Sequence, residues 1–277
     1  MSSHALTFAD VSFEVDAAVG GRITALRLAG RNLLTGPDVD PGNYGSTFWT
    51  SPQGAWGWPP PPEIDHEPYE VEATPDTLVL RGPTNPVLGL AVDKRFVADG
   101  ARSAIRQTFT IHNRGSEPTG AAPWQITRVA AGGLTLFPTG TGSFAPSNLT
   151  VRDALGVSWY AFDPAEVTGH HKLFADCAEG WLAHVDRDAL LVKTFAVVPR
   201  SLHAPGEAQI EIYASPAHNY VEVEPQGAYE TIAPGGSSEW RVSWLVRKLP
   251  LDIVSGVASA QLLAYVRALV AADTGAA

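Results

Sequence analysis

The chain has 277 residues and a formal net charge of −10; 45% of its residues are hydrophobic and 17% are charged. A charged content below the usual ~25% argues against disorder, and the hydrophobic share is sufficient for a large core. The 19 lysines and arginines form no basic stripe, which disfavours nucleic acid and anionic membranes as partners and leaves neutral ligands such as sugars.

The sequence carries few signals of compartment or assembly. Cys177 is the single cysteine, so no internal disulfide can form, which suits a reducing compartment. The first ten residues lack a charged segment followed by an apolar run, and no apolar stretch is long enough to span a bilayer. We therefore expect a cytoplasmic protein without a signal peptide, and a homodimer is left open.

Short alternating runs rich in β-branched and aromatic residues recur along the chain, separated by turn signals such as Gly20-Gly21 and Asp99-Gly100. Many short strands at similar spacing are typical of a sandwich or barrel. No fixed repeat or linker interrupts them, so we predict one all-β domain over residues 1–277. The expected strands are Ser12–Val15, Arg22–Leu28, Tyr69–Ala73, Thr77–Arg81, Leu90–Val97, Ser103–His112, Ala121–Val129, Leu134–Pro138, Gly180–Val185, Leu190–Val197, Gln209–Ala214, Tyr220–Glu224 and Ser238–Val246.

Two segments depart from this strand pattern. Pro41–Pro62 is rich in glycine, proline and tryptophan, and is expected to be an ordered loop. The tail, over about residues 251–272, has apolar residues at helical spacing, which predicts a closing amphipathic helix packed on the flank of the sandwich. The apolar positions are Ile253, Val257, Leu262, Tyr265, Val266 and Leu269.

The most informative segment is residues 218–227, His-Asn-Tyr-Val-Glu-Val-Glu-Pro-Gln-Gly, whose composition favours an extended strand. Side chains alternate across a strand, so Glu222, Glu224 and Gln226 share one face. Neighbouring carboxylates repel, and one of them is expected to hold its proton more tightly than an isolated acid. On a solvated edge strand the pair has no special role, whereas on a concave face it predicts an acid–base site for a polyhydroxylated ligand.

Three tryptophans, Trp49, Trp56 and Trp58, lie within ten positions of each other in the proline-rich segment. Flat aromatic rings complement the apolar C–H faces of sugars while polar neighbours bind the hydroxyls, so these rings are candidate ligand contacts. The alternative is that the segment covers the core as a lid. Trp124 and Gln125 are adjacent on an expected strand, where alternation allows only one of them to face a site.

The eight histidines match no metal-ligand spacing, so no metal site is expected. Imidazole titrates near neutral pH, which makes histidines candidate proton donors. The candidates are His66, His170, His171 and His218. Arg95 and Lys172 are isolated cations that either bind an anionic group on a sugar or form ordinary surface ion pairs.

Several segments together carry a family resemblance. Gly20-Gly-Arg-Ile-Thr-Ala-Leu is followed by Arg31-Asn-Leu-Leu, and Tyr220-Val-Glu-Val-Glu-Pro-Gln by Ile232-Ala-Pro-Gly-Gly-Ser. Between them lie Phe48-Trp-Thr-Ser-Pro-Gln, Trp58-Pro-Pro and Gly180-Trp-Leu-Ala-His. Over roughly residues 10–250 the chain thereby resembles an uncharacterised branch of the galactose-mutarotase-like (aldose 1-epimerase-like) superfamily. The resemblance implies a large antiparallel β-supersandwich with a sugar-binding groove on its concave face.

The resemblance also implies residue roles. Epimerases of this superfamily use a late-strand glutamate as base in a Glu-x-Gln motif, which Glu224-Pro-Gln matches, while Glu222 has the equivalent facing; both are candidates. Histidines on earlier strands act as acids, for which His170 and His171 are the candidates. The segment Ala122–Thr127 corresponds to a histidine-bearing strand of the family but contains no histidine.

Three functions are expected from these features. The first is epimerase-like exchange at an anomeric carbon without a cofactor, in which a glutamate takes the anomeric proton and a histidine protonates the ring oxygen. The second is a non-catalytic sugar-binding or sensing domain, which the missing histidine favours. The third is a polysaccharide lyase or glycoside-processing enzyme. Same-face strand neighbours such as Glu222 and Glu224 lie about 7 Å apart by strand rise, and this spacing does not exclude the carboxyl pair that glycoside hydrolysis needs. The residues expected to contact a sugar or oligosaccharide are Trp49, Trp56, Trp58, Trp124, Gln125, His218, Gln226, His66, Arg95 and Lys172.

Overall fold

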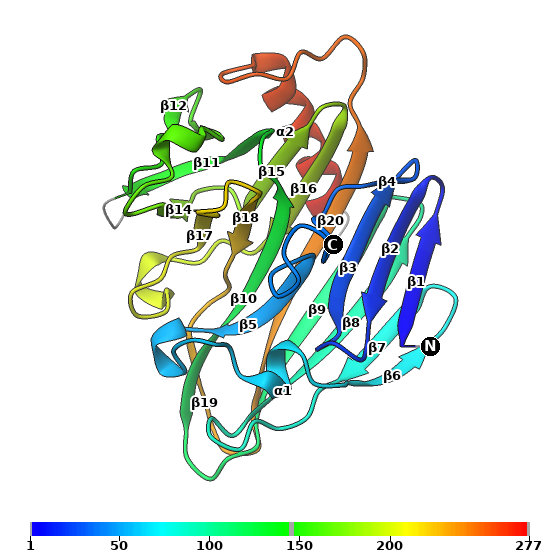
Figure 1. The fold of residues 1–277 in the computed structure, drawn as a ribbon, viewed down its shortest axis with the longest axis vertical. Helices are drawn as coiled ribbons and strands as arrows, with labels where there is room; N and C mark the ends of the chain where they lie inside the picture. Colours follow the sequence, from blue (N-terminus) through cyan, green and yellow to red (C-terminus); the bar gives the residue numbers. More distant parts are fainter. Residues whose placement is uncertain (1, 144–146, 276–277) are drawn as a thin grey trace.

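The structure, a computed structural model, describes residues 2–143 and 147–275. Twenty strands among these residues join into one continuous sheet, and the pairings between named strands are antiparallel (Figure 1). This confirms the predicted all-β class. None of the helices in these ranges is long and apolar enough to cross a membrane.

The sheet can be followed as two runs of neighbouring strands, and the first run contains the strands that carry the candidate site. It begins at the N-terminal hairpin and continues through β5 and the long β10 into strands from the second half of the chain. In spatial order it contains β1 (Ser3–Phe8), β2 (Val11–Asp16), β3 (Arg22–Leu28), β5 (Ser46–Ser51), β10 (Thr119–Ala130), β18 (Tyr220–Pro225), β17 (Ile210–Ala214), β14 (Lys172–Cys177) and β11 (Leu134–Ser143). The short β4 (Arg31–Asn32) pairs with β3, and β19 (Glu230–Ile232) pairs with β10.

The second run meets the first at β11, which pairs with strands of both runs. Its order is β6 (Glu70–Ala73), β7 (Thr77–Arg81), β8 (Leu90–Asp99), β9 (Ala104–Asn113), β20 (Ser237–Lys248), β16 (Ala189–Phe195), β15 (Trp181–Asp186), β11, β13 (Val157–Ala161) and β12 (Arg152–Ala154). Short helical turns lie in the connections at η1 (Gln53–Ala55), α1 (Pro62–Asp65), η2 (Pro164–Glu166) and η3 (Arg200–Leu202).

The main core lies between the two runs. Phe48 on β5 stacks on Phe109 on β9 with ring centroids 4.5 Å apart, and Phe13 on β2 packs edge-on against Trp244 on β20 at 6.0 Å. These contacts join apolar faces of strands distant in sequence, so the two runs pack as the layers of a sandwich.

A second cluster covers the outer side of β15, β16 and β20, where α2 (Ala260–Thr274) packs through Leu262, Leu263 and Val266. The predicted closing helix therefore exists, but its expected start near residue 251 was wrong. Ser259 begins the helix by accepting a hydrogen bond from the Leu262 backbone N–H, and Leu251 before it is fully exposed.

Seven strands of the described residues were absent from the sequence expectations, and two of them, β5 and β14, bear on the site; the others are β1, β4, β12, β13 and β19. β5 lies inside the segment Pro41–Pro62, which was expected to be a loop, and all six of its residues are buried because it pairs with β10 and packs over the core. β14 carries Lys172 and pairs with β17.

Candidate functional site

Four side chains form a row across neighbouring strands. Glu222 on β18 is the direct partner of Arg128 on β10 and of Tyr213 on β17, and Tyr213 is in turn the partner of Lys172 on β14. Side chains of directly opposed residues lie on the same face of a sheet. The row therefore presents a cation, a carboxylate, a phenol and a second cation in sequence across one face.

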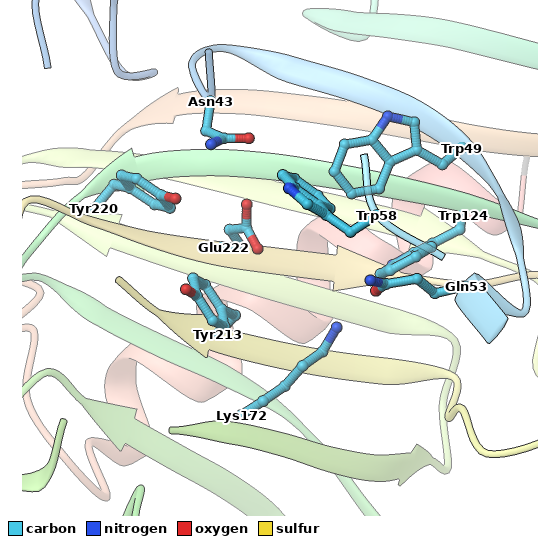
Figure 2. Close-up of a pocket in the computed structure, with 9 residues that line it drawn as sticks. All are labelled: Asn43, Trp49, Gln53, Trp58, Trp124, Lys172, Tyr213, Tyr220 and Glu222. Carbon is cyan, nitrogen blue, oxygen red and sulfur yellow. The ribbon is translucent and has the colours of Figure 1, made fainter. Parts of the chain in front are cut away.

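This face carries a pocket of about 290 Å³. Figure 2 shows indole rings on one side of it, and Glu222 between two phenol rings and Lys172 on the other. The lining residues are Asn43, Trp49, Gln53, Trp58, Trp124, Lys172, Tyr213, Tyr220 and Glu222.

Trp49 is the centre of the aromatic wall. Its ring meets the edges of Trp124 and Trp58 with centroids 5.4 Å and 6.0 Å apart. Two of the three indoles are held by carboxylate acceptors: Nε1 of Trp49 donates to Asp65 Oδ1 at 2.8 Å, and Nε1 of Trp124 donates to the buried Glu224 Oε2 at 2.7 Å. Trp58 at the rim is 62% exposed. The wall thus joins two fixed rings to one that is open to solvent.

Glu222 is the carboxylate at the pocket surface. Arg128 donates from Nε to Glu222 Oε1 at 2.8 Å and from Nη1 to Thr47 Oγ1 at 3.2 Å. Arg128 is fully buried, so this ion pair is shielded from solvent on the guanidinium side. One oxygen of Glu222 is engaged with the arginine, and the carboxylate faces the pocket with the tyrosines beside it (Figure 2).

Below Glu222 lies a second charged group built around Lys172. Its Nζ is 2.6 Å from Glu211 Oε2 and 3.4 Å from Glu224 Oε2, and both carboxyl groups are fully buried. Burial raises the pKa of Glu224 to about 7 despite the nearby ammonium, and burial likewise raises the pKa of Glu211 well above its usual value. Burial lowers the pKa of Lys172, but Glu224 and Glu211 outweigh it and hold that pKa above its ordinary value.

Five residues predicted from sequence line the pocket: Trp49, Trp58, Trp124, Lys172 and Glu222. Glu224 and Gln226 share the face of Glu222 but lie buried beneath the surface, where Gln226 donates to Glu211 Oε1 at 2.7 Å. The described residues therefore present one carboxylate to the pocket, not the two that the sequence spacing allowed.

Two predicted contacts point elsewhere. Gln125 faces the core between the layers, donating to Gln107 and accepting from the indole of Trp244, because β10 turns Trp124 to the pocket side. Trp56 donates its Nε1 to the Thr50 carbonyl at 2.7 Å and packs edge-on against Trp49, so it supports the wall from behind.

The candidate histidines and Arg95 do not line the pocket. His66 is exposed beside Asp65, and His170 is exposed in a connection before β14. His171 contacts the Gly169 carbonyl and lies 5.0 Å from the Tyr213 ring, while His218 occupies the turn between β17 and β18 with a positive φ. Arg95 is exposed on β8 in the second run. No histidine is among the described residues that line the pocket.

Sequence analysis missed the remaining lining residues. Tyr220 lies on the Glu222 face of β18, so alternation could have placed it in the site. Tyr213 enters the lining only through the pairing of β17 with β18, and Arg128 and Glu211 come to lie behind the lining through the pairing of β10 and β17 with β18, which no local pattern specifies. Asn43 and Gln53 lie in the connections flanking β5. Within residues 2–143 and 147–275, no group of three or more histidine, cysteine or carboxylate side chains is arranged to hold a metal ion.

A family model described as a domain of unknown function, DUF4380, matches residues 4–247. The search of curated proteins finds no sequence relative. Among solved structures, the galactose mutarotase related enzyme of Lactobacillus acidophilus has 8% identity and a TM-score of 0.62, covering 90% of this chain and 100% of its own. The galactose mutarotase-like protein of Lactobacillus casei has 11% identity and a TM-score of 0.61, with coverages of 88% and 100%.

A third structure, the galactose mutarotase-like protein of Clostridium acetobutylicum, has 11% identity and a TM-score of 0.54, covering 89% of this chain and 95% of its own. At such identities the likeness concerns the fold. The expected galactose-mutarotase-like fold is thereby confirmed.

Proposed function

The chain belongs to the DUF4380 family, and we propose that the pocket on its β10–β18–β17–β14 face binds a single sugar unit. One observation carries the proposal: three indoles, a carboxylate, an ammonium and two phenols converge on one cavity. Sugars expose apolar C–H faces and hydroxyls that both donate and accept, and this lining offers a partner for each.

Size and charge support the same ligand class. A cavity of about 290 Å³ lies just below the range for small-molecule sites, roughly 300–1,000 Å³, and suits one sugar ring better than an oligosaccharide. The two cations of the row are already paired with carboxylates, Arg128 with Glu222 and Lys172 with Glu211. The pocket therefore offers no uncompensated positive charge, which favours a neutral sugar.

The test is a titration of intrinsic tryptophan fluorescence with a panel of neutral monosaccharides and sugar acids. We expect saturable binding of at least one neutral sugar, weakened about threefold to tenfold by Trp58→Ala, because one aromatic contact is lost. Val87→Ala, at an exposed residue in the connection between β7 and β8, is the control and should bind as wild type. A flat response to every sugar in the panel would rule out the proposal.

Anomer interconversion on the bound sugar is the second candidate function, and the position of Glu222 favours it. A carboxylate at the pocket surface, held by Arg128 through one oxygen, is placed to accept the proton of an anomeric hydroxyl. Glycoside hydrolysis fits less well, because it needs two carboxyl groups at the substrate and the described lining presents one. Polarimetry on the sugar that binds tests this function: Glu222→Gln should slow interconversion by about 10²–10⁴-fold while binding persists.

A further inference from the structure

Beneath the pocket, two buried carboxyl groups share a single ammonium. Glu211 and Glu224 are direct cross-strand partners on β17 and β18, both are fully buried, and both contact Nζ of Lys172. Lys172 itself reaches the pocket, so the cluster connects the buried pair to the ligand space (Figure 2).

One positive charge compensates only one of the two carboxylates, so the pair has reason to retain a proton. Its surroundings add little compensation. The charged or titratable groups facing it from packed elements are Glu222 and Tyr213 beside it, Arg128 paired to Glu222, Glu207 before β17, and Lys193 from β16. Lys193 is fully buried, burial lowers its pKa well below the usual value, and its Nζ donates to Thr127 Oγ1 and the Val223 carbonyl instead of to the pair.

The hydrogen bonds of the pair agree with a retained proton. Glu224 Oε2 accepts from Trp124, but its Oε1 is buried without a partner. Burying an ionised oxygen there without a hydrogen bond would cost much free energy, whereas the unpaired oxygen of a neutral carboxyl group incurs a smaller penalty. The raised pKa of Glu224, about 7, is consistent with a proton that is exchanged near neutral pH.

We propose that Lys172 donates a proton to the ring oxygen of the bound sugar and that the Glu211–Glu224 pair resupplies it. The inference rests on the proposed sugar site. In the forward step, Glu222 takes the proton of the anomeric hydroxyl, the bond between the anomeric carbon and the ring oxygen breaks, and the ring oxygen receives a proton from Lys172 Nζ. The carboxyl pair then passes its proton to Nζ, and ring closure on the other face reverses each transfer.

The row across the strands places donor and base on opposite sides of one ligand. Lys172 and Glu222 are separated by Tyr213 on the strand between them, so their backbones lie about 10 Å apart by strand spacing. The long lysine side chain extends from β14 toward Trp124, with Nζ 4.7 Å from the ring centroid, and Lys172 and Glu222 both line the pocket (Figure 2). Lys172 contacts the substrate in this scheme, whereas Glu211 and Glu224 act through it as positioning residues.

The first test is polarimetric interconversion of the sugar that binds, measured across about pH 5–9. Turnover in the wild type should fall as pH rises through about 7, because the carboxyl pair then lacks the proton with which it resupplies Lys172. Glu224→Gln keeps the shape and an acceptor for Trp124 but has no proton to give, so turnover should drop about a hundredfold and the fall near neutral pH should disappear. Glu72→Gln, at an exposed ion pair on β6, is the matched control.

Lys172→Met removes the donor and should also lose about a hundredfold in turnover, with Lys248→Met as its exposed control. Lys172→Met leaves two buried carboxyl groups without a cation and could disturb folding for that reason alone. The double variant Lys172→Met with Glu224→Gln removes one of these carboxyl groups and therefore serves as a second test with less buried charge. Wild-type turnover in either lysine variant, or an unchanged pH profile in Glu224→Gln, would overturn the proposal.

An infrared measurement examines the retained proton without any sugar. The wild type at neutral pH should show a protonated carboxyl band that Glu224→Gln lacks and Glu72→Gln keeps; its absence from the wild type would overturn the proton-donor assignment.

Fluorescence titration separates the two proposals. Saturable binding with interconversion at the buffer rate would leave the sugar site standing and reject Lys172 as donor, whereas no binding would reject both.

Discussion

Nε1 of Trp124 donates a 2.7 Å hydrogen bond to Oε2 of Glu224, so one residue of the pocket wall is anchored on a carboxyl group buried below it. Trp49 is anchored in the same way on Asp65 at 2.8 Å. Both rings face the cavity while their polar edges are satisfied inside the protein. The acidic residues near the pocket therefore differ in role: Glu222 lines the pocket, whereas Glu224 and Asp65 anchor the indole rings of its wall.

Replacing Glu224 by leucine should destabilise the protein. The substitution leaves the Trp124 indole N–H without its acceptor and Lys172 with one carboxylate instead of two. Loss of these buried polar partners should lower the free energy of unfolding by about 2–4 kcal/mol, measured by urea denaturation. Glu224→Gln retains an acceptor and should lose less; equal losses in the two variants would contradict the anchoring role.

Asp65→Ala should weaken sugar binding although Asp65 does not line the pocket. Its carboxylate holds the Trp49 indole and pairs with Arg22 at 3.3 Å, and without it the central ring of the wall is free to turn. Titration by tryptophan fluorescence should show a larger affinity loss for Asp65→Ala than for Asp65→Asn, which keeps an acceptor. Asp188→Ala, at an exposed ion pair, serves as the control.

Gly20→Ala should disturb the same wall from a distance. Gly20 has φ of +64°, and a β-carbon there would collide with the backbone carbonyl of Asp65. The backbone of α1 would have to move, so we expect a loss of more than about 1 kcal/mol in unfolding free energy together with weaker sugar binding. Gly30→Ala also lies at positive φ but meets open space, which makes it the comparison for backbone strain alone.

The buried His184 should contribute to acid sensitivity. Burial lowers its pKa from 6.5 to about 4, so between these values the unfolded chain binds a proton that the folded protein does not. Stability from this group is complete above about pH 6.5 and falls as pH drops toward 4, by on the order of 3 kcal/mol. Denaturation curves at about pH 7 and 4.5 should differ less for His184→Gln than for wild type; an identical pH dependence would refute this.

Alternation in residues 220–226 correctly placed Glu222, Glu224 and Gln226 on one face, because side-chain direction in a strand depends on the local backbone alone. It did not reveal that Glu224 lies below the surface. That depth follows from Trp124 and Lys172, which come from strands β10 and β14 on either side. Likewise, adjacency required that Trp124 and Gln125 face opposite ways, but only the pairing of β10 with β5 and β18 decided which faces the pocket.

By itself, the sequence determined the β class, most strand positions and the shared facing of the acidic residues, since these depend on short-range periodicity and turn chemistry. The tertiary structure decided the row Arg128–Glu222–Tyr213–Lys172, the burial of the Glu211–Glu224 pair and the absence of histidine among the described pocket residues. These features depend on strand register between segments up to about a hundred residues apart, where packing of the whole core selects one alignment.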